Sequence, residues 1–439
     1  MPVGLLAGWG RTAITRTELV EPTRESVANH VRSGNSLIAR GMGRGYGDCA
    51  VVAGGKTVST RQLRSLRVDG GCIEVDAGTS LEEVMKFALP QGRFVPVTPG
   101  TRFVTVGGAI AADIHGKNHH RDGTFGSHVE WIDLLLASGE IRRLTPSDKL
   151  FWATVGGMGL TGIILSARVQ MTPVETAQMN TVNQQVKNVD ALMDLMVRAD
   201  HEWRYSVAWV DTMATKGSLG RSVLSTGEHA TRTDARVKGD PLAYEPRQRL
   251  TAPSFVPSGV LNKWSVRAFN EAWFRKAPRK AKKGLESITH FFHPLDGVAE
   301  WNRIYGRNGF IQYQVVVPDS HGSTIPWMIE TFATRQVPVF LAVLKRFGAA
   351  NHGMLSFPTT GWTLAVDIPA GVDGVARILD EMDERVVGEG GRIYLAKDSR
   401  MNPRHLASMY PRLNEFRSLR DEIDPSSRFK SNLSQRLGL

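Results

Sequence analysis

Glycine stands at every second position from 41 to 47 in the segment IARGMGRGYGDCA, residues 38–50. A dinucleotide-binding turn of the Rossmann type needs G-x-G-x-x-G opening a helix. Here the third interval is one residue short, and Tyr46 stands where the last glycine belongs. The residues that follow lack a helical period and predict a loop and then a strand. Alternate glycines let a backbone approach a bulky ligand and offer N–H groups to anionic oxygens. The segment therefore predicts a ligand cradle with no helix behind it, or else a flexible surface loop.

Two further glycine-rich segments lie within the first 165 residues, at 95–129 and 155–162. The first of them is too long and too rich in Gly, Thr and Pro to be a plain linker. From about Glu175 the sequence changes to longer polar stretches and a basic, proline-bearing region, so we expect a domain boundary there.

Local signals predict several elements before that boundary. Val27 and Val31 share one face of a short helix that leads into a strand at 36–40. Ser80, with Glu83 three residues later, has the spacing of a capping box at the start of another helix. The turn at 138–139 predicts a hairpin between two strands.

The composition leaves several partners open. Lysine and arginine outnumber the acids by 54 to 43, so the surface should attract nucleic acid, lipid headgroups or a phosphorylated substrate.

Cys49 and Cys72 are the two cysteines of the chain and support neither a disulfide framework nor a thiolate metal site. The start, MPVGLLAGWGRT, lacks the basic region of an export signal, and no apolar run reaches membrane-spanning length. Any membrane contact is therefore expected to be peripheral.

Four motifs together carry a family resemblance: ARGMGRGYGD, PGTRFVTVGGAIAADIHGKNHH, LFWATVGGMGLTGII and the late YLAKDSR. They resemble the vanillyl-alcohol-oxidase type of FAD-dependent oxidoreductase. Within that superfamily the chain is similar to the decaprenylphosphoryl-β-D-ribose 2′-oxidases of actinobacterial cell-wall synthesis. This likeness also covers GRNGFIQYQVVVP, VLKRFG, LSFPTTGW and DPSSRF, and so runs over nearly the whole chain.

The resemblance implies an α+β fold with a two-subdomain FAD-binding domain of the vanillyl-alcohol-oxidase (PCMH) type at 1–175. A sheet-based substrate-binding domain follows at 176–391, and a C-terminal segment, 392–439, returns to the FAD-binding domain. In this family the first glycine loop and the VTVGG segment hold the FAD pyrophosphate from two sides.

The family pattern also assigns the cofactor contacts, many of them through backbone. Many members attach FAD covalently through a histidine in the first loop, where this chain has Tyr46, so non-covalent FAD is expected. Cys49 is a conceivable alternative attachment point nearby. The implied FAD contacts are Arg40, Gly41, Met42, Gly43, Arg44, Gly45, Tyr46, Gly47, Asp48, Cys49, Gly100, Thr105, Val106, Gly107, Gly108, Ala112, Asp113, Ile114, His115, Ile164 and Tyr394.

The implied catalytic residues are Lys397, Tyr46 and His115. A desolvated lysine near a flavin can act as a base or stabilise an anionic reduced ring. His115, with His119 and His120, could also be interpreted as a metal ligand. Adjacent histidines without a carboxylate or cysteine set are weak evidence for a metal, so no metal is expected.

The implied substrate-binding residues lie in the second half of the chain. Gln312 and Gln314 alternate on a predicted strand, so both amides can face one site. Lys345 would supply a fixed cation for a substrate phosphate, and Trp209 an apolar wall. The chain departs from the mycobacterial members at two further substrate positions, where Thr363 replaces an asparagine and Ala365 a cysteine.

The run RKAPRKAKKG, residues 275–284, holds six basic residues. It is interpreted either as a solvated loop or as a mobile basic loop beside the active site that contacts lipid headgroups. Nucleic-acid binding is the competing interpretation, but the sequence shows no nucleic-acid-binding motif.

The resemblance therefore implies FAD-dependent oxidation of the 2′-hydroxyl of a polyprenylphosphoryl ribose to the 2′-keto sugar. A separate NADH-dependent keto-reductase would complete the epimerisation to the arabinose form. The family location implies an enzyme peripheral to the cytoplasmic membrane, in the cell envelope or periplasm. The alternatives are a soluble FAD-dependent sugar or alditol oxidase and a nucleic-acid-binding module.

Overall fold

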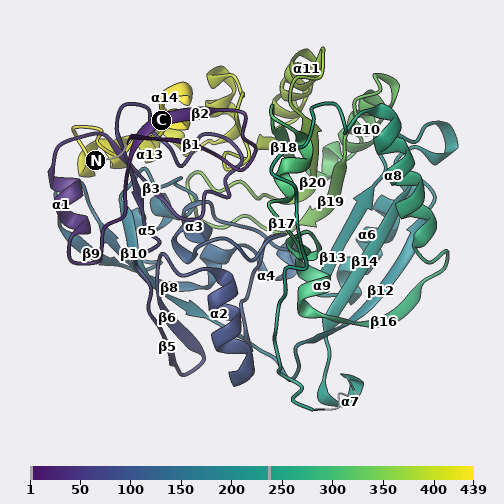
Figure 1. Ribbon diagram of the computed structural model, residues 1–439, viewed down its shortest axis with the longest axis horizontal. Helices are drawn as coiled ribbons and strands as arrows, with labels where there is room; N and C mark the ends of the chain where they lie inside the picture. The colour runs from purple at the N-terminus through teal and green to yellow at the C-terminus, as the bar shows by residue number, and fades with distance from the viewer. Residues whose placement is uncertain (1–2, 236–238) are drawn as a thin grey trace.

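A computed structural model describes residues 3–235 and 239–439. It contains three main sheets with helices packed around them, which confirms the predicted α+β class (Figure 1). Two sheets come from the first part of the chain and the third from the middle, and the last residues return to the first. No helix within the described ranges is long and apolar enough to cross a membrane.

The first sheet has four strands in the order β1-β2-β4-β3. β4 pairs in parallel with both β2 and β3, and the short helix α1 connects β2 to β3. Val27 and Val31 are the buried residues of α1, as their spacing predicts. The bounds are β1 (Val3–Ala7), β2 (Ile14–Val20), α1 (Val27–Arg32), β3 (Leu37–Arg40) and β4 (Lys56–Ser59).

The second sheet has five antiparallel strands in the order β5-β6-β10-β8-β9. β8 and β9 form the predicted hairpin, and the predicted capping box between Ser80 and Glu83 begins α2. The bounds are β5 (Leu66–Asp69), β6 (Cys72–Asp76), α2 (Leu81–Ala88), α3 (Val106–Ala111), α4 (His119–Asp122), β8 (Val129–Leu135), β9 (Ile141–Leu144), α5 (Lys149–Thr154) and β10 (Ile163–Gln170).

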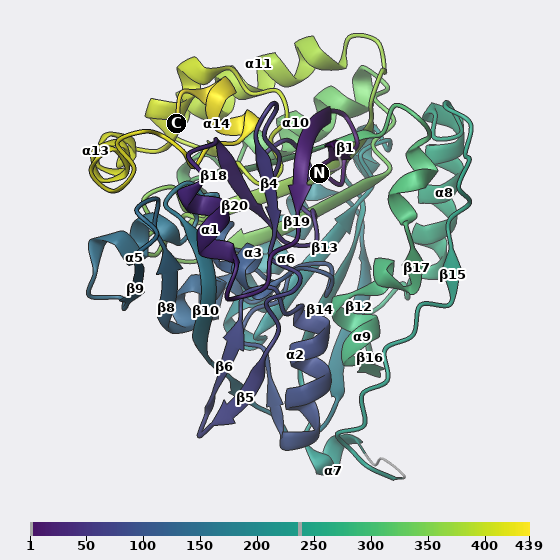
Figure 2. The same cartoon turned by 60° about the vertical axis from the view of Figure 1, so that its left-hand side comes forward.

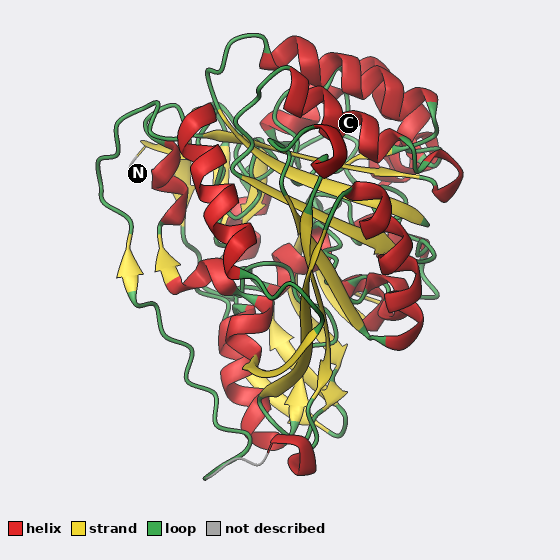
Figure 3. Cartoon of the chain, turned by 90° about the vertical axis from the view of Figure 1, so that its right-hand side faces the viewer, coloured by secondary structure: helices red, strands yellow, loops and turns green. Residues whose placement is uncertain are grey.

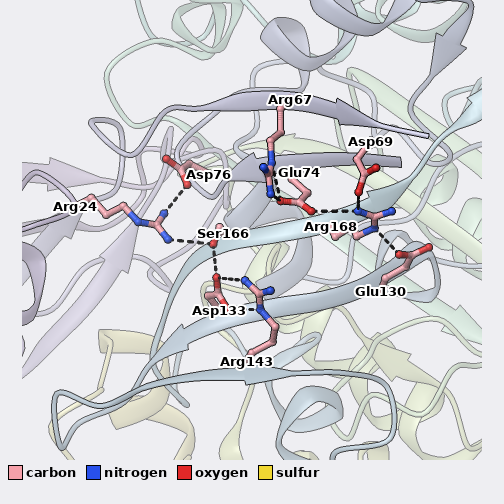
Figure 4. A network of polar contacts seen from close by, with 10 residues as sticks. All are labelled: Arg24, Arg67, Asp69, Glu74, Asp76, Glu130, Asp133, Arg143, Ser166 and Arg168. Atoms are coloured by element: carbon pink, nitrogen blue, oxygen red, sulfur yellow. Dashed lines mark hydrogen bonds and ion pairs between the residues drawn. The ribbon is translucent and has the colours of Figure 1, made fainter. Parts of the chain in front are cut away.

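A network of ion pairs covers one face of this second sheet (Figure 4). Arg168 lies at its centre and pairs with Asp69, with Glu130 at 2.7 Å and with Glu74 at 3.1 Å. The network ties β5, β6, β8 and β10 together through their side chains. Because most of these groups are partly exposed, each pair contributes little to stability on its own.

The third sheet has eight strands in the order β16-β12-β14-β13-β19-β20-β18-β21 and runs through the molecule between helices (Figure 3). Tyr313 on β18 donates to Asp383 on α11 (Val375–Gly388) at 2.9 Å, so α11 covers one face of the sheet. The strands are β12 (Gln178–Val186), β13 (Tyr205–Val210), β14 (Ser222–His229), β16 (Lys282–Ser287), β18 (Phe310–Val317), β19 (Leu341–Phe347), β20 (Gly361–Pro369) and β21 (Arg392–Ile393).

The remaining elements connect these sheets or close the fold. Phe429, near the C-terminus, forms a bridge with Leu37 of β3, so the last residues lie against the first sheet. The other helices are α6 (Val189–Glu202), α7 (Arg232–Ala235), α8 (Lys263–Lys276), α9 (Ile288–Phe292), α10 (Thr324–Thr334), α11 (Val375–Gly388), α12 (Leu406–Met409), α13 (Leu413–Ile423) and α14 (Asn432–Leu437). Two small sheets pair β7 (Arg93–Phe94) with β11 (Thr172–Pro173) and β15 (Leu250–Thr251) with β17 (Val298–Ala299).

The basic run at 275–284 corrects one expectation. It is not a loop beside the cavity described below, because it comprises the end of α8, a short connection and the edge strand β16. Three strands, β12, β14 and β13, separate β16 from β19 in the sheet. The residue types predicted the charge of this run correctly, but the pairing of Lys282 to Ser287 with β12 is a tertiary feature that the residue types do not reveal.

Candidate active site

The first glycine segment is held by its carbonyl groups. The N–H of Trp9 donates to the carbonyl of Gly45 at 2.8 Å, and the N–H of Gly10 donates to Tyr46 at 3.1 Å. In the described part of the chain, the backbone N–H groups of residues 42–45 have no protein acceptor, and Gly43 has a positive φ of 63°. The segment is therefore anchored on one side and keeps its donors for a ligand, as the predicted cradle requires.

Two glycine-rich segments meet at Gly41 and Thr105. A Cβ on Gly41 would lie 2.2 Å from the Thr105 Oγ1, so any larger residue would displace Thr105. That same hydroxyl caps α3 by accepting from the N–H of Gly108 at 3.2 Å. The contact fixes the distance between the two segments.

A cavity of about 310 Å³ lies between these segments and the eight-stranded sheet. Most of the predicted site residues line it, although they come from all three parts of the sequence. These residues are Gly41, Met42, Gly43, Arg44, Gly45, Tyr46, Cys49, Gly100, Thr105, Gly107, Gly108, Ala112, Ile114, His115, Ile164, Gln312, Gln314, Lys345, Ala365, Tyr394 and Lys397.

Five predicted cofactor contacts lie outside the cavity lining and support its walls instead. Arg40 donates to the carbonyl of Ala7 at 2.8 Å, and Asp48 pairs with Arg436 at 2.9 Å. Asp113 is fully buried and accepts hydrogen bonds from three protein partners. As FAD contacts, these five residues stay predictions. The five are Arg40, Gly47, Asp48, Val106 and Asp113.

The strand register explains how the substrate-binding residues come together. Gln314 pairs with Ala365, Ala365 with Val343, and Val343 with Trp209, which forms one row across β18, β20, β19 and β13. Directly paired residues point to the same face of a sheet. The neighbouring rows add Gln312, Asp367 and Leu341 on one side and Thr363 and Lys345 on the other.

Trp209 and Thr363 share this face but do not line the cavity. Thr363 is buried and accepts a hydrogen bond from the amide of Gln314 at 3.1 Å. Trp209 lies one strand beyond Val343, at the border of the cavity. Thr363 therefore orients Gln314 and Trp209 flanks the wall, and direct substrate contact stays a prediction for both.

A cationic cluster surrounds His115. The Lys345 Nζ lies 3.1 Å from the His115 Nδ1, and the Gln314 Nε2 lies 2.9 Å from the His115 Nε2. Burial lowers the pKa of Lys345 to about 7, and the charges of Lys117 and Lys397 act in the same direction. Burial also holds the pKa of His115 well below its usual range, so this ring is neutral. The Gln314 Nε2 can only donate, so the His115 Nε2 accepts from it and the ring N–H lies at Nδ1, where the Lys345 amine accepts it when Lys345 is neutral.

Lys397 faces Tyr46, and its charge depends on Asp367. The Lys397 Nζ lies 3.8 Å from the centre of the Tyr46 ring. Burial lowers the pKa of Lys397 to about 7, while the charge of Asp367 opposes that effect. Asp367 accepts from the Gln312 amide at 2.6 Å, and burial raises the pKa of Asp367 to about 6. The amine can therefore gain or lose a proton near neutral pH.

The three neighbouring histidines have separate partners. His119 accepts from the N–H of Gly348 at 3.1 Å, and the His120 Nε2 lies 3.0 Å from the carbonyl of Trp203. His115 faces the cavity. Within the described ranges, no group of three or more metal-ligating side chains converges.

Sequence reasoning missed several residues of the site. Trp9, Leu295 and Trp301 line the cavity, and the Arg44 guanidinium lies 3.6 Å over the Trp9 ring. These residues lie outside the motifs, so no sequence signal identified them. Asp367 could have been found, because it lies two residues after Ala365 on the same predicted strand.

The cavity fits a long anionic cofactor such as FAD. The cradle donors of residues 42–45 are free of protein partners, and the Arg44 Nε is buried without an acceptor within the described ranges. An anionic pyrophosphate would satisfy both features. The wall formed by Gly107, Gly108 and Ala112 leaves room for a flat ring system, since its side chains are small.

Comparisons with known proteins agree with this geometry. The FAD binding domain family matches residues 19–145. The chain is 42% identical to decaprenylphosphoryl-β-D-ribose oxidase of Mycolicibacterium smegmatis over 99% of this chain and 97% of that protein. It is 37% identical to an uncharacterized protein of Streptomyces coelicolor over 82% of this chain and all of that one. An L-gulono-1,4-lactone dehydrogenase of Mycobacterium tuberculosis is 21% identical over 98% and 97% of the two chains. The chain therefore belongs to the decaprenylphosphoryl-β-D-ribose oxidase family of FAD-dependent oxidoreductases.

Proposed function

We propose that the protein oxidises the 2′-hydroxyl of a polyprenylphosphoryl-β-D-ribose to the 2′-keto sugar. The observation that carries this proposal is Lys345, a buried amine on the cavity wall with a pKa of about 7 and no carboxylate partner in the described part of the chain. A substrate phosphate would supply the missing negative charge and raise the pKa of Lys345. The amides of Gln312 and Gln314, in neighbouring rows on the same sheet face, can bind sugar hydroxyls.

FAD, when bound, supplies the two-electron oxidant for the C2′–H bond. The proposed holders of its phosphates are the free N–H groups of residues 42–45 and the guanidinium of Arg44. The Lys397 Nζ accepts the proton of the 2′-hydroxyl as the C2′–O bond becomes a carbonyl. A lysine whose pKa is about 7 has a large neutral fraction at physiological pH and can act as this base.

The product identifies the reacting carbon. We expect that incubation with farnesylphosphoryl-β-D-ribose and an electron acceptor, followed by trapping with borodeuteride, places one deuterium at C2′. The trapped sugar should contain both the ribo and the arabino epimer. Deuterium at another carbon, or none, would contradict the proposal.

FAD is proposed to be held without a covalent bond. Tyr46 occupies the position of the attachment histidine, and burial raises the pKa of the Cys49 thiol to about 11, which keeps it protonated and unreactive. Acid precipitation of the purified protein should therefore release the yellow colour into the supernatant. Colour that stays in the pellet would show a covalent link.

The pH profile should report the coupling between Lys397 and Asp367. Asp367→Asn removes the charge that raises the pKa of Lys397, so this pKa falls further below about 7. Because the neutral amine is the proposed base, the decline in flavin reduction rate on the acid side should move to lower pH. Stopped-flow reduction across pH 5 to 9 measures this shift, roughly one pH unit or more. If the rate of the variant declines at the same acidic pH as that of the wild type, Asp367 does not raise the pKa of Lys397.

The proposal includes a protein partner, a membrane contact and a location. A separate NADH-dependent keto-reductase would reduce the 2′-keto sugar to the arabinose form. The polyprenyl chain requires peripheral contact with the cytoplasmic membrane, and the proposed location is its cell-envelope side. A soluble sugar or alditol oxidase remains the second candidate, supported by the 21% identity to a lactone dehydrogenase.

A further inference from the structure

We propose that Tyr305 is a positioning residue of the active site, whose hydroxyl holds the Asp367 carboxylate that acts on Lys397. The inference deepens the proposed function, because it rests on Lys397 as the base for the sugar hydroxyl. Tyr305 does not line the cavity. Its effect on the reaction therefore passes through Asp367 and Lys397.

Two side chains hold the carboxylate of Asp367. The Gln312 amide donates to its Oδ1 at 2.6 Å, and the Tyr305 hydroxyl donates to its Oδ2 at 3.3 Å. Gln312 lines the cavity, so it can exchange this bond for one to a bound sugar. Tyr305 is 4% exposed and lies behind the cavity wall, so its bond remains when substrate binds. Tyr305 is therefore the fixed partner of the two.

Aromatic packing sets the direction of the Tyr305 hydroxyl. The ring stacks on Phe310, with ring centres 4.1 Å apart and an angle of 11° between the planes. Phe340 packs against it edge-on, with the centres 6.0 Å apart. Because the stacked rings are both buried, the Tyr305 side chain has little freedom to turn away from Asp367.

The same aromatic group reaches the amine of Lys397. Phe310 packs edge-on against Tyr46, with ring centres 5.4 Å apart, and the Lys397 Nζ lies 3.8 Å from the centre of the Tyr46 ring. Asp367 and Lys397 are thus linked by their opposite charges and also through the three rings of Tyr305, Phe310 and Tyr46. One packed unit positions both the amine and the carboxylate.

The segment that carries Tyr305 is anchored on the glycine cradle. Tyr305 ends the 3-10 turn Trp301–Tyr305, and the Asn302 amide of this turn donates to the carbonyl of Trp9 at 3.0 Å. The N–H of Phe310 donates to the carbonyl of Gly10 at 2.8 Å, so the start of β18 lies against the residues that follow β1. Figure 2 shows the strands of the first sheet in front of β18 and β20. Tyr305 is therefore held by the FAD-binding part of the chain, whereas Asp367 belongs to the eight-stranded sheet.

Most groups around this pair stay uncharged near pH 7. The titratable groups whose charges act on Asp367 or Lys397 are Tyr46, Cys49, His115, Tyr305 and Lys345. Burial holds the pKa of both tyrosines well above the usual range, raises the pKa of Cys49 to about 11 and lowers that of His115. Lys345, with a pKa of about 7, is the exception, and it is unchanged in every variant compared below.

The sign of the expected effect follows from the hydrogen bond. Burial raises the pKa of Asp367 to about 6, and the bonds from Gln312 and Tyr305 oppose that effect because they favour the charged carboxylate. Without the Tyr305 hydroxyl, Asp367 takes up its proton at a higher pH. Less negative charge then remains on Asp367 while Lys397 titrates, so the pKa of Lys397 falls.

Tyr305→Phe tests this role, because it removes the hydroxyl and keeps the stacked ring. With farnesylphosphoryl-β-D-ribose as substrate, the acid-side decline in the flavin reduction rate should move to lower pH by about half a pH unit. In the Asp367→Asn background the same substitution should cause no further shift, since the group through which it acts is gone.

Tyr313→Phe is the matched control. Tyr313 is equally buried, and its hydroxyl also donates to a buried aspartate, Asp383, whose pKa burial likewise raises to about 6. Asp383 lies on α11, on the opposite face of the sheet from the cavity residues Gln312 and Gln314. The pH profile of this control should match that of the wild type.

A second substitution and a second readout extend the test. Replacing Tyr305 by 3-fluorotyrosine keeps the ring and makes the hydroxyl a stronger donor, so the profile should move to higher pH. Acetic anhydride labelling of the FAD-loaded protein across the pH range, followed by mass spectrometry of the peptide that contains Lys397, gives the pKa of this amine without turnover. The labelling should show the same shifts as the reduction rates.

An unchanged pKa of Lys397 in both substitutions at position 305 would overturn the role of Tyr305. A shift for Tyr305→Phe that persists in the Asp367→Asn background would also overturn it, because the effect would then bypass Asp367. If the wild-type flavin is not reduced by the prenylphosphoryl sugar, the proposed function fails. The labelling of Lys397 would still decide whether Tyr305 acts through Asp367.

Discussion

Lys397→Met is expected to keep FAD and the fold but to slow anaerobic flavin reduction by substrate at least about 100-fold. Methionine keeps the length and the apolar stem of the side chain, so the packing against the Tyr46 ring should survive. What disappears is the amine whose pKa near 7 lets it take the hydroxyl proton. Stopped-flow absorbance measures the rate, and the flavin-to-protein absorbance ratio measures FAD content.

Lys86→Met is the matched control for this variant. Lys86 lies on the exposed side of α2 and pairs with Glu82 at 3.4 Å, a surface contact of little energetic weight. The control should reduce at the wild-type rate. If the Lys397 variant reduces its flavin at that same rate, Lys397 takes no part in the reaction. Loss of FAD from that variant would instead assign it a structural role.

Gly41→Ala is expected to weaken FAD binding roughly 10- to 100-fold, because it forces apart the two segments that form the cradle. The new Cβ would lie 2.2 Å from the Thr105 Oγ1, so Thr105 must move. That movement also weakens the N-cap of α3, which is worth about 1 kcal/mol. Fluorescence titration of the apoprotein with FAD measures the affinity.

Gly71→Ala is the control for this prediction. Gly71 lies in the turn between β5 and β6, and a Cβ there meets nothing within 4 Å. Its FAD affinity should equal that of the wild type. Equal affinities for both variants would mean that the contact between Gly41 and Thr105 does not set the width of the site.

Local sequence signals predicted the local structure well. The capping box at Ser80 and Glu83, the helix with Val27 and Val31 and the hairpin after β8 all form as expected. Each depends on residues within a few positions of one another, so the information is contained in a short window. The glycine motif also predicted correctly that no helix follows the first loop, since β4 is the next element.

The sequence could not reveal which motif residues support the site from behind. Arg40 and Asp113 lie among cavity residues in the sequence, yet their side chains bind protein atoms. Thr363 and Trp209 lie on the same sheet face as the cavity residues, but they contact Gln314 and Val343 rather than the cavity itself. The coupling of Asp367 to Lys397 joins two separate segments. These features depend on strand register and on side-chain direction, which emerge only in the folded molecule.

Anaerobic flavin bleaching with matched substrates tests the central claim most directly. The FAD-loaded protein is mixed with farnesylphosphoryl-β-D-ribose, with free D-ribose or with an alditol, and the flavin absorbance is followed. The proposed function predicts rapid bleaching with the prenylphosphoryl sugar and none on the same time scale with the other two, because Lys345 requires a phosphate. Bleaching by the free sugar or the alditol, with no response to the prenylphosphoryl sugar, would contradict it.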